Sequence, residues 1–186
     1  FQGSRGLGDV YKRQNYYFPL DFTVGGAVAS FGRRLEWPDD FFRVMWSAKF
    51  MQKEYEGSQS DIDNYIGGLQ KTRGISLSQV LSRDSRNRAE FPTNGSTFIL
   101  ENTYSGGFLG GNENFQKHML TLDWFTPTFS KFVLYNSVKL GVIKTIDVGD
   151  DIQSFVPFDE RFIMGGNGIP YGNALRGYPD NAIGPQ

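Results

Sequence analysis

Apolar and polar residues alternate along most of this chain, as they do in β-strands. In residues 41–55, five consecutive even positions are apolar and the odd positions include three cations. The even set is Phe42, Val44, Trp46, Ala48 and Phe50, and the cations are Arg43, Lys49 and Lys53. Because successive side chains of a strand point to opposite faces, this segment predicts a strand with one apolar and one charged face.

The same period of two recurs in five further segments. One of them, residues 23–35, is weaker because it is rich in glycine and alanine. The predicted strands are residues 23–35, 41–55, 74–85, 96–108, 115–128 and 132–144. Most exceed the five or six residues usual in soluble sheets and suit a tilted crossing of a lipid bilayer, which takes about 9–11 residues.

The connections between these strands also alternate in length. Those at residues 36–40, 86–95 and 129–131 are compact, whereas 56–73 and 145–186 are long polar loops. The remaining connection, 109–114, is short and rich in glycine, so it fits the rule only loosely. Tight turns at one rim and longer loops at the other are typical of outer-membrane β-barrels.

The pattern therefore predicts an all-β fold, an antiparallel up-and-down transmembrane β-barrel. The smallest such barrels have about 8 strands, so we expect six strands to be part of a larger barrel. The predicted lipid-facing residues are Phe42, Trp46, Leu122, Trp124 and Leu140. A soluble lipid-binding barrel or sandwich alternates in the same way with its apolar face inward, and it remains the alternative.

Composition narrows the possible functions. The formal net charge is -1, which gives no electrostatic argument for nucleic acid binding. The chain has no cysteine, and no apolar run is long enough for a transmembrane helix. Residues 1–14 show no clear period, so we interpret them as a non-native or disordered segment, with a polar surface loop as the alternative. We assign residues 15–186 to the partial barrel, including the loop 145–186.

Nothing in the sequence predicts a catalytic, cofactor or metal site. The single histidine, His118, lies on the apolar face of its strand, where a packed or interfacial role is expected. Asp61, Asp63 and Asn64 are spaced faintly like a calcium loop, but the terminal bidentate glutamate is missing. We therefore expect a solvated loop there and a protein that is not an enzyme.

Arg176 stands out because it lies in the longest loop, among glycines and prolines. Long loops without secondary structure are usually functional or disordered. An ordered loop could fold back into the barrel and bring its guanidinium to a carboxylate of the inner wall, which arginine binds in a bidentate manner. The alternative is an arginine exposed at the surface.

Two sets of motifs resemble the Omp85 superfamily. The loop reads ERFIMGG at residues 160–166, LRGY at 175–178 and IGP at 183–185. The third connection reads SRDSRN at 82–87 and FPTNGS at 91–96. Together they are similar to the sixth-loop signature and a turn motif of that family. The residues of the loop motif are Gly165, Gly166, Leu175, Arg176, Gly177 and Tyr178.

The resemblance is strongest to the branch that folds and inserts β-barrel proteins into the outer membrane of Gram-negative bacteria. It implies a sixteen-strand barrel, preceded by periplasmic POTRA domains, of which this chain holds six strands and most of the sixth loop. It also implies that Arg176 docks on acidic residues of later strands. The implied partners are unfolded outer-membrane clients, the protein's own POTRA domains, accessory lipoproteins and membrane lipid.

Other functions remain open within this resemblance and outside it. A related Omp85 transporter, such as a two-partner secretion pore or a TamA-like factor, shares the arginine motif. A passive diffusion barrel would share the strand pattern only.

Overall fold

The computed structural model describes residues 11–13, 20–149, 156–165, 174–179 and 182–183. These residues form one antiparallel sheet in which each strand pairs with the next along the chain, from β1 to β7. The strands are β1 (Tyr11–Arg13), β2 (Asp21–Arg34), β3 (Phe42–Glu56), β4 (Lys71–Asp84), β5 (Gly95–Ser105), β6 (Phe115–Pro127) and β7 (Val133–Thr145). The predicted all-β, up-and-down architecture is confirmed, with its six long strands.

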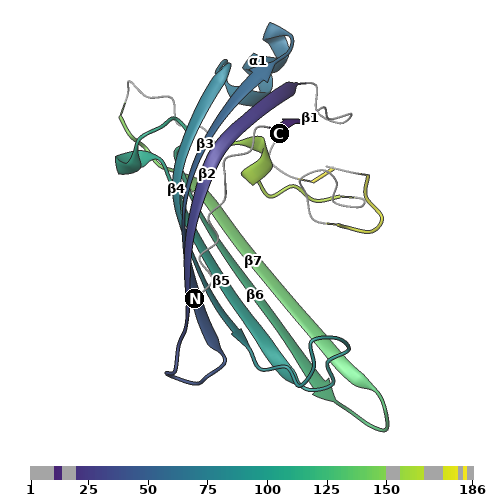
Figure 1. Ribbon diagram of the computed structural model, residues 1–186. Helices are drawn as coiled ribbons and strands as arrows, with labels where there is room; N and C mark the ends of the chain where they lie inside the picture. The colour runs from purple at the N-terminus through teal and green to yellow at the C-terminus, as the bar shows by residue number, and fades with distance from the viewer. Residues whose placement is uncertain (1–10, 14–19, 150–155, 166–173, 180–181, 184–186) are drawn as a thin grey trace.

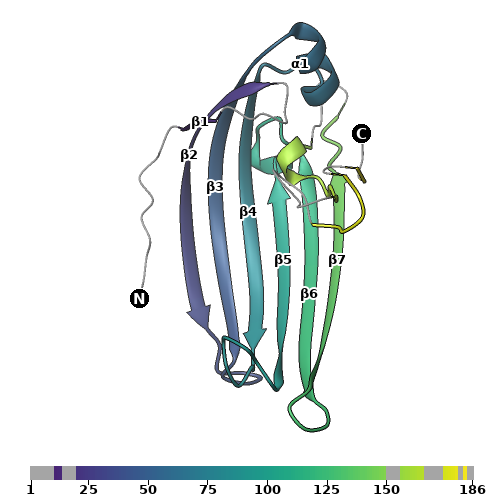
Figure 2. The ribbon, with the colours of Figure 1, turned by 90° about the vertical axis from the view of Figure 1, so that its right-hand side faces the viewer.

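The sheet is strongly curved and does not close on itself (Figures 1 and 2). The segment after β7 lies against one face, which we call the inner face; the opposite one is the outer face. Short connections join β2 to β3, β4 to β5 and β6 to β7 at one end. The other three connections lie at the opposite end and include the two longest, although the β5–β6 connection (106–114) is no longer than the β4–β5 connection (85–94).

The register places the apolar residues together on the outer face. Leu81 pairs with Leu100, Leu100 with Leu120, and Leu120 with Leu140, so four leucines form one row across β4 to β7. On the inner face, a parallel row holds Ser30, Ser47, Ser78 and Thr103. The Ser30 hydroxyl donates to Ser47 at 3.1 Å, and the hydroxyls of Ser78 and Thr103 lie 3.0 Å apart. The two faces thus differ as the period of two requires.

The prediction of a loop at residues 56–73 is wrong in part, because this segment contains the helix α1 (Gln59–Ile66). Ser58 caps its start by accepting from the Asp61 amide, and Gly67 ends it in the left-handed conformation. A helix this short depends on packing for its stability. Ile62 and Ile66, one turn apart, are buried with Leu20, Tyr55 and Phe22 at the end of the sheet. This cluster holds four of the buried apolar residues in the described part of the chain, with the partly buried Phe22 packed against it.

The short strand β1 lies within the segment that sequence analysis sets aside. It pairs with β2 in antiparallel register, with Tyr11 opposite Val24 and Arg13 opposite Phe22. Among the described residues, no helix has the length and apolar character that a membrane crossing demands.

Candidate functional site

The candidate site is the contact between the inner face and the loop that follows β7. Residues 156–165 of this loop include a single helical turn, η2 (Phe158–Glu160), which contributes two carboxylates in succession, Asp159 and Glu160. In both ribbon views this segment lies against the concave side of the sheet (Figures 1 and 2). The loop therefore returns to the polar wall.

The first contact is a buried charge network around Lys53 of β3. Its ammonium lies 3.0 Å from both carboxylate oxygens of Asp159 and 3.5 Å from Glu113 Oε1. Lys53 is only 4% exposed and Glu113 only 6%. The hydroxyl of Thr72 donates to Glu113 at 2.8 Å, which gives this buried carboxylate a second partner, whereas the Asp159 side chain is 38% exposed. Burial of charge requires such pairing and hydrogen bonding.

The second contact is made by Lys117 of β6. Its ammonium donates to the backbone carbonyl of Glu160 at 2.9 Å and to the side-chain Oε2 at 3.0 Å. The same ammonium lies 5.3 Å from the ring centroid of Phe162, within the range of a cation–π interaction. Lys117 thus contacts both the backbone and the side chains of the ERF part of the loop motif.

The wall is shaped to receive this segment at Gly141 of β7. A Cβ atom at this position would come within 2.5 Å of Phe162 Cζ, so the ring occupies the space that a side chain would fill. Ile163 is 3% exposed, and Gly165 is buried as well. The loop therefore packs on the wall through apolar as well as charged groups.

Replacing Gly141 with valine is expected to displace the Phe162 ring and to destabilise the docked loop by about 1–3 kcal/mol, the usual cost of overpacking. The measurement is the denaturation midpoint of the full-length protein in lipid. Gly32→Val is the matched control, because a Cβ there would meet nothing closer than 3.7 Å. Equal midpoints for the two variants would contradict the contact.

A backbone bridge closes the loop after this docked segment. Met164 and Ile183 exchange two hydrogen bonds, of 2.7 and 3.0 Å between nitrogen and oxygen. The bridge forms a neck, and we call the part of the sequence between its two residues, which includes the LRGY motif, the excursion. Arg161, next to the neck, donates to the Val156 carbonyl at 3.2 Å, and its burial lowers the pKa of the guanidinium below its ordinary value.

The structure places the predicted loop residues on this excursion. Leu175 is half-buried, whereas Arg176 is exposed and Gly177 adopts a positive φ of 88°. Tyr178 is 51% exposed, and Gly166 lies outside the described residues. The docking of Arg176 on a wall carboxylate stays a prediction.

The five residues predicted to face lipid all lie on the outer face. Trp46, Trp124 and Leu140 are 42%, 39% and 59% exposed, and Phe42 and Leu122 are half-buried. His118 lies on the same face, with its Nδ1 2.8 Å from the Asn102 side-chain oxygen. Their contact with lipid stays a prediction, but the strand register that it requires is present.

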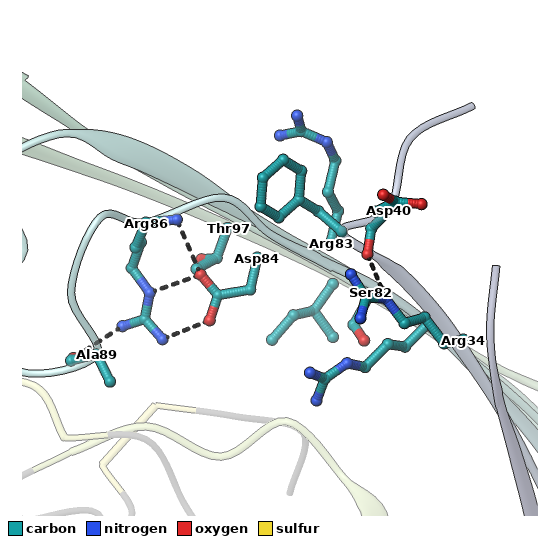
Figure 3. A pocket seen from close by; sticks show the side chains of 11 residues that line it. Arg34, Asp40, Ser82, Arg83, Asp84, Arg86, Ala89 and Thr97 are labelled. Carbon is teal, nitrogen blue, oxygen red and sulfur yellow. Dashed lines mark hydrogen bonds and ion pairs between the residues drawn. The ribbon is translucent and has the colours of Figure 1, made fainter. Parts of the chain in front are cut away.

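The turn motif occupies a second site, at the opposite end of the sheet. Arg86 makes a two-pronged contact with Asp84, at 2.9 Å through Nε and 2.7 Å through a terminal nitrogen, and these hydrogen bonds raise the pKa of Arg86 (Figure 3). Arg83 reaches the neighbouring turn, where Nε donates to Asp39 at 2.8 Å. The motif therefore ties two turns together beside a recess of about 420 Å³, which Arg34 and Arg43 also line.

Sequence reasoning placed Lys53 on a charged strand face but missed the pairing of Lys53 and Lys117 with the loop. Asp159 precedes the ERF motif and Glu160 opens it, so alternating lysines on two strands and an acidic loop motif were both visible. Their partnership was not, because it depends on how the loop returns. Among the described residues, no group of three potential metal ligands is present.

Comparison with known proteins identifies the class of protein that this sheet and its docked loop represent. The Omp85 superfamily domain model matches residues 3–186, and the chain belongs to this superfamily. Members of the family are outer-membrane proteins of Gram-negative bacteria.

Two members of the superfamily show what the chain is similar to. The chain is 30% identical over 183 residues to the outer membrane protein assembly factor BamA of Nitratidesulfovibrio vulgaris (strain Hildenborough). The match covers 96% of this chain but only 21% of that relative's length. The fold resembles the crystal structure of BamA from Haemophilus ducreyi lacking POTRA domains 1–3, with a TM-score of 0.72 and 17% identity over 96% of this chain and 34% of that one.

Proposed function

We propose that this chain is part of the barrel of an outer-membrane protein assembly factor of the BamA type. Such a protein would fold and insert client β-barrels into the outer membrane of a Gram-negative bacterium. The similarity to the assembly factor of N. vulgaris supports this role. The observation that carries it is the sixth-loop segment docked on the inner face by Lys53 and Lys117.

The proposed activity needs no covalent chemistry, cofactor or metal, so the protein would not be an enzyme. An open strand edge offers unpaired backbone groups on which a client strand can form, in the manner of β-augmentation. The apolar outer face would contact lipid. Clients, accessory lipoproteins and the protein's own POTRA domains are the proposed partners.

In this proposal Arg176 acts by binding a carboxylate of the inner wall. A guanidinium binds carboxylate through two parallel hydrogen bonds, which fixes orientation as well as position. The exposed placement of Arg176 beyond the loop neck leaves its donors available for such a contact.

Replacing Arg176 with alanine in the full-length protein is expected to slow client assembly by about tenfold, the effect of losing roughly 1.4 kcal/mol. Arg176→Lys should recover only part of the rate, because lysine cannot bind in a bidentate manner. The measurement is the folding rate of a client barrel in proteoliposomes. Arg88→Ala, at an exposed arginine of the third connection, is the control and should leave the rate unchanged.

Two outcomes would count against the proposal. Normal client folding by the Arg176→Ala variant would remove the assigned role of the loop. Transport of a soluble client across the vesicle membrane, without insertion of a barrel, would instead assign the chain to the related Omp85 transporters.

A further inference from the structure

The charged contacts at the base of the loop join it to two separate strands. Lys53 belongs to β3 and Lys117 to β6, and two strands, β4 and β5, lie between them in the sheet. Their loop partners, Asp159 and Glu160, are adjacent in sequence. One turn of chain therefore spans the inner face and is fixed at both ends, which restrains its orientation as well as its position.

The contact at Lys53 is made by a buried ammonium that has two carboxylate partners. Lys53 is shared between Asp159 of the loop and Glu113 of the β5–β6 connection, and Glu113 keeps a second bond from Thr72. Two carboxylates therefore face one ammonium. If the loop leaves, Lys53 still pairs with Glu113. Release therefore does not leave a buried charge without a partner, which would be costly. The contact can thus hold the loop and still be reversible.

Glycines in the wall fit both contacts. A Cβ at Gly74 would overlap the Glu113 carboxylate, and a Cβ at Gly141 would collide with the Phe162 ring. Glycine within a strand weakens it and often marks a close approach of another group. These two glycines of β4 and β7 supply the space that the charged network and the loop ring occupy.

The neck at Met164 and Ile183 follows the two contacts directly. The excursion that carries Arg176 therefore starts from a base held by β3 and β6. We propose that Lys53 and Lys117 are positioning residues, which fix the base of the loop and thereby set where Arg176 is presented. This inference rests on the proposed function for its purpose, but the contacts can be tested apart from client assembly.

The test uses charge reversal and exchange in the full-length protein, in a background without other cysteines. Lys117→Glu, Glu160→Lys and the two together are compared, with Lys139→Glu as the control on the same face. Ile163→Cys reports docking, since this residue is buried when the loop is held. Each single reversal should raise its rate of maleimide labelling by about tenfold, because the docked segment opens more often. The double exchange should lower the rate again, though not to the original value, because it re-forms the side-chain pair but not the hydrogen bond to the Glu160 carbonyl or the contact with Phe162. Lys139→Glu should leave the rate unchanged.

A second readout tests positioning itself. Spin labels at Tyr178→Cys, beside Arg176, and at Lys144→Cys on β7 should give a distance distribution that broadens in each single reversal and narrows again in the exchange. A variant that does not fold is set aside in favour of Lys53→Gln, with Lys49→Gln as its control. Faster labelling with an unchanged distribution would overturn the proposal, as would an exchange that improves neither readout over the single reversals. These results do not depend on client folding, so the failure of the assembly role would appear separately in the Arg176→Ala rates.

Discussion

Replacing Leu120 with arginine is expected to destabilise the folded protein in a lipid bilayer by about 2–4 kcal/mol, as cationic residues do near the bilayer centre. Leu120 lies in the row of leucines that crosses the outer face, between Leu100 and Leu140. An arginine there would either desolvate its charge among acyl chains or draw water into them. Neither cost arises if this face contacts water.

The neighbouring residue provides a matched control for this prediction. Thr121 belongs to the same strand but points to the inner face, where it lies between Ile99 and Lys139. Thr121→Arg adds the same charged side chain on the wet side and should cost far less. The measurement is denaturant unfolding of both full-length variants in vesicles, followed by tryptophan fluorescence. Equal destabilisation of the two variants would contradict the assignment of the faces.

Replacing Gly95 with alanine should destabilise the turn between β4 and β5 by about 3 kcal/mol. About 1–2 kcal/mol of this comes from the left-handed backbone, because Gly95 has a φ of 105°. The rest comes from overpacking, since the new methyl group would sit 2.7 Å from the Arg86 Cα. The glycine of the FPTNGS motif is therefore required by the close approach of the returning chain.

Gly110 allows the backbone cost to be measured apart from the cost of overpacking. Its φ of 81° is also positive, but a Cβ there would meet nothing within 4 Å. Gly110→Ala should therefore show the backbone cost alone, about 1–2 kcal/mol. Both variants can be compared by their unfolding midpoints in lipid. A Gly95 variant no less stable than the Gly110 variant would mean that the turn does not close as the structure has it.

The strands and the composition of their two faces could be predicted because they depend on local sequence. A period of two decides which residues share a face whatever the sheet pairs with. The outer set, including Trp46, Trp124 and Leu140, follows directly from it. The alternation of short and long connections likewise predicted which strand ends lie together.

The helix α1 could not be predicted in the same way. Its sequence, QSDIDNYI, is polar overall, and eight residues are too few to be stable alone. It forms because Ile62 and Ile66 meet Leu20, just before β2, and Tyr55 of β3. Such tertiary contacts leave no mark in the helix sequence beyond the caps at Ser58 and Gly67.

The candidate site was likewise predictable only in its local features. The sequence identified the loop, its motif and the charged residues of the polar faces. It could not pair Lys53 with Asp159, which lies 106 residues further along the chain, or choose Glu113 as their companion. Nor could it show the polarity of this contact. Here the sheet supplies the cation, Lys53, and the loop supplies the anion, Asp159. The contact predicted for Arg176 has the opposite arrangement, with the cation on the loop.

By itself, the sequence determined the alternating strands, the apolar and polar faces and the family motifs, because each is written within a few neighbouring residues. Only the tertiary structure decided which face the returning loop covers, which lysines hold it and where the short helix packs. Those contacts join residues far apart in the chain, and their free energy comes from burial and charge pairing, which exist only once the sheet has formed.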